Sequence, residues 1–230
     1  AKAKENIISS SIIEFERNIF TMVREFDRIP LKTEERRPRV GIVGEILLKY
    51  HPDANNHAVQ TVEREGGEVV STDLADFILY TLYDHVFSYK QLGGSRKASR
   101  DALTAIALLE LTRLGMRIAF KMSRHFTPPE RFSKLRKKVT QLVSLGHQAG
   151  EGWLLTAEMV KMLESGVNSI LCVQPFGCLP NHITGKGVIR ELKRRYPHAN
   201  IIALDYDPGA SEANQINRIK LMMSSALLEQ

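Results

Sequence analysis

Two kinds of hydrophobic pattern alternate along this chain. Short runs rich in β-branched residues, which are typical of buried parallel strands, lie at about residues 39–48, 68–72, 169–174 and 200–206. Longer segments carry apolar residues three and four positions apart and predict helices, at about 7–28, 74–89, 96–122, 128–144, 153–165, 182–196 and 211–228, with one more capped by Asp53 or Asn55 and ending near Glu65. The sequence therefore predicts an α/β fold of three layers, Rossmann-like or flavodoxin-like, with a parallel sheet of about four strands and right-handed crossovers.

The same pattern predicts how the chain is divided. Residues 1–38 form a predicted N-terminal helix and a linker, and residues 39–230 form the α/β domain. Within that domain, about 95–145 has helical patterns but no strand pattern, so we predict a helical insertion between the second and third strands. The sequence begins with Ala and the linker 32–39 is charged, from which we expect a fragment of a longer protein.

Composition narrows the class of protein. A chain of 230 residues, 43% of them hydrophobic, can bury a sizeable core. No apolar stretch approaches the roughly 20 residues of a membrane span, the N-terminus lacks a signal-peptide pattern, and both cysteines lie near one loop, so we expect a cytoplasmic protein without a membrane partner. The net charge of +6 comes from local runs such as Arg36-Arg37, 131–138 and 193–195. No aromatic residues interleave with them, which favours solvated helix faces over a nucleic-acid partner.

The strongest candidate site follows the third predicted strand. Pro175 and Gly177 end that strand, and the next nine residues hold a thiol, a carboxamide, an imidazole and an ammonium, contributed by Cys178, Asn181, His182 and Lys186. Ligands of open α/β sheets bind at the carboxyl ends of the strands, where helix N-termini offer unpaired N–H groups. We therefore predict a cofactor-binding site here, with Lys186 facing an anion such as a phosphate or carboxylate. His182 as a merely solvated residue is the alternative.

Further polar residues are expected at the same edge. Substrate-binding candidates are Glu45, Asn55, Asn56, Glu151 and Asp207. Structural alternatives stand beside them, because Asp207 can cap the last helix and the glycine-flanked Glu151 can belong to a lid or to a plain connection. Cys172 lies inside the third strand, where a free cysteine behaves as a small hydrophobic residue.

Two common nucleotide-binding patterns are missing from the sequence. Gly185-Lys186-Gly187 lacks the spacing of a Walker loop, and no Gly-x-Gly-x-x-Gly follows a strand. We therefore do not expect this chain to bind a nucleotide.

Long phrases of the sequence nevertheless resemble a known family. PFGCLPNHITGKGVIRELKRRYP and NIIALDYDPGASEANQINRIKLM, with VGIVGEILLKYHPDANN and GEGWLLTAEM, are similar to the C-terminal part of acyl-CoA dehydratase activase-related proteins, relatives of the 2-hydroxyacyl-CoA dehydratases. The resemblance spans roughly Arg39 to Ser225. It implies an iron-sulfur protein of the 4Fe-4S type, reduced by an ATP-hydrolysing activator, fused or separate, and acting on a CoA thioester or related small molecule. It also implies that Cys178 is a metal ligand.

One well-placed thiol is too few for a cubane cluster, which commonly takes four thiolates. We expect the other ligands to come from elsewhere, and the isolated fragment to fold without a cluster and without ATPase or dehydratase activity. The alternative function is a non-catalytic domain that docks the activator or another subunit through its basic helices. The sequence leaves open whether the protein forms a homo-oligomer.

Overall fold

The computed structural model describes residue 4 and residues 11–31, 36–207 and 209–228. Parts of the predicted first helix (7–10) and of the linker (32–35) lie outside the described residues. The chain forms two compact units, one of residues 1–35 and 81–131 and one of residues 36–80 and 132–230. Each is described separately below.

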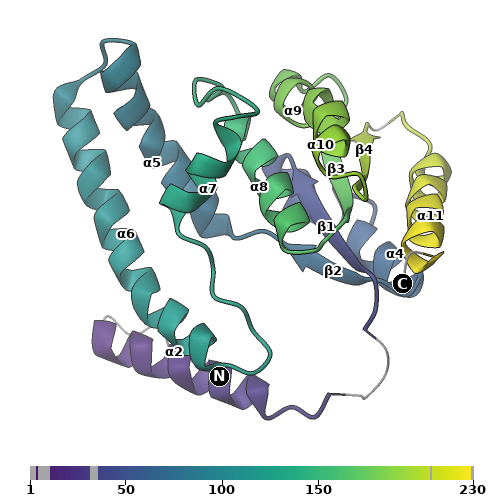
Figure 1. Ribbon diagram of the computed structural model, residues 1–230, viewed down its shortest axis with the longest axis horizontal. Coiled ribbons are helices and arrows are strands. Elements are labelled where there is room, and N and C mark those ends of the chain that lie inside the picture. Colours follow the sequence, from purple (N-terminus) through teal and green to yellow (C-terminus); the bar gives the residue numbers. More distant parts are fainter. Residues whose placement is uncertain (1–3, 5–10, 32–35, 208, 229–230) are drawn as a thin grey trace. The chain divides into compact units, whose positions relative to one another are not determined.

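The second unit contains the predicted parallel sheet. Its strands are β1 (Arg39–Gly44), β2 (Glu68–Ser71), β3 (Ser169–Pro175) and β4 (Asn200–Tyr206). They pair in the order β2-β1-β3-β4, and every neighbouring pair is parallel (Figure 1). The predicted Rossmann-like α/β sheet is confirmed, and all four carboxyl ends lie at one edge.

Helices cover both faces of this sheet (Figure 1). Alternate strand residues such as Val43, Ile170 and Cys172 pack against α8 (Gly152–Glu164) and α10 (Ile189–Arg195). The intervening residues, such as Ile42 and Leu171, pack against α4 (Ala58–Arg64) and α11 (Glu212–Leu228). This alternation follows from the two-residue period of a strand, and β3 is apolar on both faces because both are covered.

Four short helical elements complete this unit. They are α3 (Ile46–Tyr50), α7 (Phe132–Val139), α9 (Leu179–Thr184) and the 3₁₀ helix η1 (Lys186–Val188). Helix α5 (Leu74–Gln91) begins in this unit and continues into the other.

The first unit is helical among its described residues. Helix α2 (Ile12–Asp27) packs on α6 (Arg96–Met122) through a small core in which Ile19, Val23 and Ala119 are buried. Asp27 at the end of α2 accepts a hydrogen bond from the Ser123 hydroxyl at 2.6 Å, and this bond lowers the pKa of Asp27. Ser11 and Ser95 cap the two helices through their side-chain oxygens.

Three predicted boundaries were wrong. The first strand ends at Gly44 rather than at residue 48, because φ of Gly44 is +139° and Glu45 then caps α3. The predicted helix 182–196 begins earlier, at Leu179, and is broken at Gly185 into α9, η1 and α10. The predicted helix 128–144 is confined to α7.

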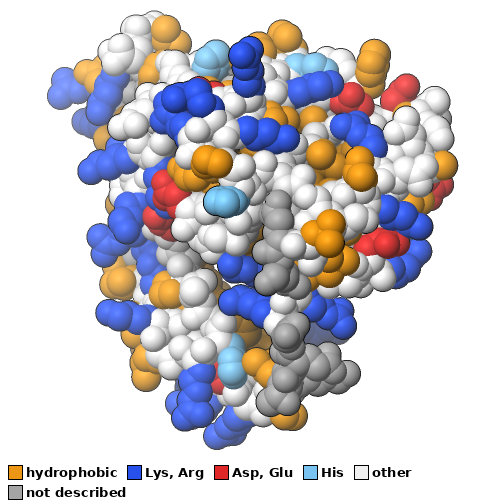
Figure 2. Space-filling view, turned by 45° about the vertical axis from the view of Figure 1, so that its right-hand side comes forward, with side chains coloured by type: hydrophobic (Ala, Val, Ile, Leu, Met, Phe, Trp, Pro, Cys, Tyr) orange, Lys and Arg blue, Asp and Glu red, His pale blue; other side chains and the backbone are white. Residues whose placement is uncertain are grey.

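Among the helices of the described residues, none is both long and apolar enough to cross a membrane. Figure 2 shows Lys and Arg side chains spread over the visible face among hydrophobic and uncharged side chains. Several form local ion pairs along one helix, as between Lys97 and Asp101 or between Glu191 and the arginines Arg194 and Arg195. Such exposed pairs contribute little to stability.

Gly44 is where the sheet tolerates least change. A Cβ at this position would lie 1.8 Å from the Val173 carbonyl oxygen, on a backbone with positive φ. We expect Gly44→Ala to lower the free energy of unfolding by at least about 3 kcal/mol, measured by urea denaturation. Gly66→Ala is the control, because φ of Gly66 is +90° but nothing lies within 4 Å of its Cβ position. Its loss should be about 1 kcal/mol, and equal losses in the two variants would contradict the close approach.

Candidate functional site

Cys178 lies at the carboxyl edge of the sheet, immediately after β3. The turn at Gly177, with φ +73°, brings the Cys178 N–H to the Pro175 carbonyl oxygen at 3.2 Å, and Cys178 becomes the residue before α9. Its side chain is only partly buried. The Asn181 amide nitrogen donates to Cys178 Sγ at 3.2 Å, and His182 Nδ1 lies 2.9 Å from the Cys178 carbonyl oxygen. Three of the four predicted cofactor-binding residues are therefore linked in one turn of chain.

Two residues close to Cys178 in the sequence, one before it and one after it, have buried carboxamide oxygens. Asn181 and Gln174 are both fully buried, and neither Asn181 Oδ1 nor Gln174 Oε1 has a hydrogen-bond partner in the described residues. Leaving a buried acceptor unpaired costs about 1–3 kcal/mol, so most such atoms in folded proteins are paired with a protein group or an ordered water.

Asp205 connects the ends of β3 and β4. Gln174, its direct neighbour across the two strands, donates through Nε2 to Asp205 Oδ1 at 2.5 Å. Lys186 Nζ lies 3.4 Å from Asp205 Oδ2, and Gln215 Nε2 donates to the Asp205 carbonyl oxygen at 3.0 Å. The predicted anion-binding Lys186 is thus paired with a carboxylate, while 46% of its side chain stays exposed. Sequence reasoning missed Asp205 and Gln174, although their two-residue offset from Cys172 and Ala203 along the strands marks the same face.

The second thiol has a different environment. Cys172 is fully buried in the core between β3 and α8, as predicted for a packing residue. Burial raises the pKa of the Cys172 thiol to about 12, and the negative charges of Asp205, Glu158 and Glu151 add to the increase. A thiol held protonated in this way is a poor metal ligand, because metals bind the thiolate.

The loop after β1 is held by its own polar side chains. Glu45 Oε2 accepts from the Leu48 N–H at 3.0 Å and so caps α3. Asn55 is buried, donates to the Leu48 carbonyl oxygen at 2.6 Å and accepts from the Ala58 N–H at 3.0 Å, which confirms its predicted capping of α4. Asn56 donates to Gln215 Oε1 at 2.7 Å. The side chains of these three predicted substrate-binding residues therefore form hydrogen bonds within the protein.

Two carboxylates, Glu151 immediately before α8 and Glu158 within it, anchor that same loop. Glu151 is 5% exposed, and its Oε1 accepts from the Ile46 N–H at 2.9 Å. Further along α8, Glu158 accepts from Lys49 Nζ through Oε1 at 3.1 Å and through Oε2 at 3.2 Å, and both side chains are almost completely buried. Burial raises the pKa of Glu158, an effect that the Lys49 ammonium opposes. Glu151 therefore fastens the start of α8 to the start of α3.

The remaining strand-end carboxylates are more peripheral. Asp207 is exposed, and its carbonyl oxygen accepts from the Ala210 N–H at 2.8 Å in the turn before α11. Asp73 Oδ1 accepts from the Ala75 N–H at 2.9 Å at the start of α5. A cavity of about 180 Å³ lies between residues 146–149 and 152 on one side and the α9 residues Leu179, Pro180, Ile183 and Thr184 on the other.

The described residues contain no group of three or more His, Cys, Asp or Glu side chains placed to hold a metal ion. What they offer at this edge is one accessible thiol with an amide donor, two buried acceptor oxygens and a lysine–aspartate pair. Comparison with known proteins gave no match to a family model, to a curated protein or to a solved structure.

Removing Lys49 tests the anchor of the first loop. Lys49→Met leaves the Glu158 carboxyl buried without its partner, and we expect the free energy of unfolding near neutral pH to fall by about 3–5 kcal/mol. Without the ammonium, the pKa of Glu158 in the folded protein rises further above the ordinary value that this residue has in the unfolded chain. The folded state then binds the proton more tightly, so the loss should be small below the ordinary glutamate pKa and grow as the pH rises through the raised value.

Denaturant titrations between about pH 4 and pH 8 measure this dependence. The matched control is Lys49→Met combined with Glu158→Gln, which removes the buried charge and should flatten the pH dependence. A loss that is the same at every pH in both variants would contradict a charged role for the pair.

Proposed function

We propose that this chain is a domain of an iron-sulfur protein related to the 2-hydroxyacyl-CoA dehydratases and their activases, to whose cluster or substrate site it contributes Cys178. The long phrases similar to that family support the proposal, because they include the motif that contains this cysteine. The position of Cys178 supports it independently. It is a partly exposed thiol at the carboxyl edge of an all-parallel sheet, the edge at which ligands of such sheets bind.

The residues present fit one ligand of a cluster. The Asn181 amide donates to Cys178 Sγ at 3.2 Å, and hydrogen bonds to ligating sulfurs are among the groups that set the reduction potential of a cluster. Cys172 does not fit as a second ligand, because it is buried and its pKa is raised to about 12. The remaining ligands would come from another segment or another chain. A cluster held there would supply one-electron transfer.

Apolar side chains around the thiol favour a site completed by further protein. Phe176, Leu179 and Ile183 flank Cys178 and are 75%, 68% and 45% exposed. A second protein surface packed on these three residues would bury them and exclude water from the sulfur. We infer that the chain positions the thiol, donates to it from Asn181, and presents Lys186 at the same edge, where its half-exposed ammonium can meet an anionic group of a CoA thioester.

The alternative function is a non-catalytic domain that docks an ATP-hydrolysing activator or another subunit. The observation that favours it is a basic surface on α7 and α10. The Arg195 guanidinium donates to the Gln141 carbonyl oxygen at 3.0 Å, which ties the end of α10 to the chain after α7. Lys134, Lys137, Arg190 and Lys193 are exposed on these helices and would suit an acidic partner.

Anaerobic reconstitution of the full-length protein with iron and sulfide tests the proposal. We expect Cys178→Ser to lose most of the cluster absorbance and bound iron, because one thiolate ligand is gone. Cys172→Ala is the matched control and should keep the wild-type cluster content, since this sulfur lies in the core.

Equal iron content in wild type and Cys178→Ser would overturn the proposed role of the thiol. If the Ser variant also kept wild-type activity while charge reversal at Lys134 and Lys137 abolished binding of the activator, the docking function would be favoured instead. Circular dichroism of each variant checks that the fold is retained.

A further inference from the structure

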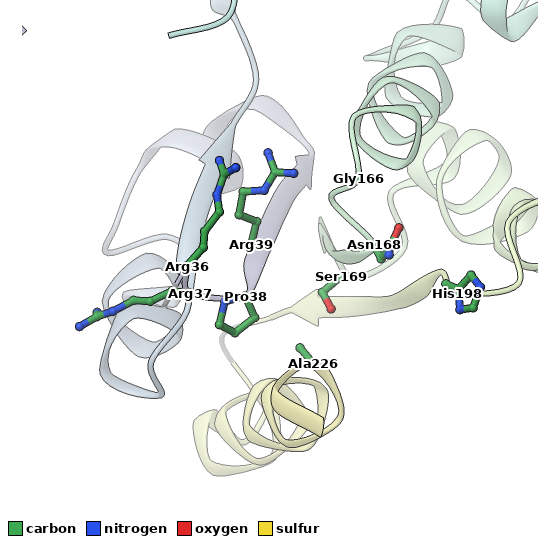
Figure 3. A pocket seen from close by; sticks show the side chains of 9 residues that line it. All are labelled: Arg36, Arg37, Pro38, Arg39, Gly166, Asn168, Ser169, His198 and Ala226. Atoms are coloured by element: carbon green, nitrogen blue, oxygen red, sulfur yellow. The ribbon is translucent and has the colours of Figure 1, made fainter. Parts of the chain in front are cut away.

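Two features of the described residues play no part in the function proposed above. The first is a cavity of about 400 Å³ in the second unit, beside the amino ends of β1 and β3. Arg39 in its lining donates to the Ser165 carbonyl oxygen at 2.9 Å. Figure 3 shows the Arg37 guanidinium extending away from the wall that contains Asn168 and Ser169, so we base no proposal on this cavity. The second feature is one face of α6, in the first unit.

Helix α6 carries an exposed apolar stripe on this face. The stripe consists of Leu103, Ala107, Leu111, Leu114, Ile118 and Met122, all of them exposed. Its members are 4, 4, 3, 4 and 4 residues apart, so they share one side of the helix about 100° wide and extend along it for about 28 Å. Leu111 and Met122 are 63% and 74% exposed. A contiguous apolar face of this length marks an interaction surface.

Helix α6 joins its own unit through other sides. Ala119 is buried against Ile19 and Val23 of α2, and Figure 1 shows α2 beside that end of α6. A Cβ at Gly115 would lie 2.7 Å from the carboxyl carbon of Glu16, which shows how closely α2 approaches there. The buried residues of α6 all lie outside the stripe. The stripe is therefore a face that the packing of the first unit does not use.

The spacing of the stripe is the same in both directions along the helix. Its midpoint falls between residues 112 and 113. A two-fold axis at this point would place a second α6 antiparallel to the first, with Leu111 against the partner's Leu114. At the same register Ala107 faces the partner's Ile118. Leu103 then faces the partner's Met122. Every apolar residue of the stripe thus meets an apolar residue, and a second copy of the chain is a matching occupant.

The charges near the stripe are compatible with this pairing. Glu110, beside the middle of the stripe, already forms an ion pair with Arg117 of the same helix. The basic residues Arg100 and Lys121 lie at the two ends of the stripe, and the antiparallel arrangement brings each near the other in the partner. Repulsion between exposed charges is small at physiological salt. It opposes the burial of twelve apolar side chains in the pair, and it makes the pairing sensitive to salt.

We propose that this chain forms a dimer in which the two α6 helices pack antiparallel through the stripe, about a two-fold axis at its midpoint. The proposal rests on the first unit alone and does not depend on the function proposed for the Cys178 edge.

Sedimentation equilibrium of this chain tests the proposal. We expect a monomer–dimer equilibrium with a dissociation constant on the order of 10 µM. The dimer should become tighter as the salt concentration rises from about 0.05 M to about 0.5 M, because salt screens the repulsion between the basic ends. An interface held together by ion pairs would weaken instead.

Two double variants test the register. Leu111→Lys with Leu114→Lys places like charges opposite each other, and dimerisation should weaken at least about tenfold. Leu111→Lys with Leu114→Glu places each lysine opposite a glutamate of the other copy, so this variant should dimerise more tightly than the first. The matched control is Leu221→Lys with Leu227→Lys on α11, where both leucines are exposed. Its dissociation constant should stay within about twofold of wild type.

A wild-type chain that stays monomeric up to about 500 µM would overturn the proposal, whatever else covers the stripe. Dimerisation of the double-lysine variant with wild-type affinity would overturn it as well. Equal affinities of the lysine–lysine and lysine–glutamate variants would contradict the antiparallel two-fold register. Circular dichroism of each variant checks that the helices are retained.

Discussion

The buried ion pair between Lys49 and Glu158 is the interaction on which the carboxyl edge of the sheet depends. Taking two charges out of water costs several kcal/mol each, and only close pairing recovers it. The pair forms between a helix just after β1 and the middle of α8, so it fixes α3 against α8. Glu151 adds a second bond from α8 to the start of the same helix. Loops at strand ends are often mobile, and here two buried carboxylates hold the first of them.

The two thiols of the chain have different environments at this edge of the sheet. Glu151, Glu158 and Asp205 lie on the side of the sheet that α8 covers, and their negative charges, together with burial, keep Cys172 protonated. Cys178 lies six residues later, beyond the end of β3, where the chain turns out of the core. Cys178 is therefore only partly buried, while its backbone is fixed by hydrogen bonds with Pro175 and His182. A fixed, accessible sulfur is what a metal or an electrophile requires.

The sequence predicted the sheet well because buried strands leave a direct signature. Val, Ile and Leu runs bounded by Gly and Pro located all four strands, and their alternation with helices implied the parallel order. Boundaries were less predictable. The run 39–48 is apolar on both sides of Glu45, so hydrophobicity could not reveal that φ of Gly44 ends the strand and that Ile46 already belongs to a helix. Likewise, Gly185 breaks a helix that its sequence period presents as continuous.

The candidate site was predicted in part. Cys178, Asn181 and His182 lie together because a single turn of chain carries them, and local sequence contains that information. Asp205 rather than Asp207 bonds to Gln174 and Lys186, because Asp205 lies inside β4 directly opposite Gln174, whereas Asp207 follows the last residue of that strand. The partner of Lys49 is 109 residues away in the sequence, a distance over which no local pattern indicates pairing.

Site-resolved thiol alkylation tests the central claim of this account, that Cys178 is a partly exposed residue at the carboxyl edge of the sheet and Cys172 a core residue. The reduced native chain is treated with iodoacetamide, and each cysteine peptide is followed by mass spectrometry. We predict that Cys178 reacts at least about tenfold faster than Cys172, since both exposure and thiolate fraction control the rate, and that the two react alike in denaturant. Equal rates in the native chain, or protection of Cys178, would contradict the account.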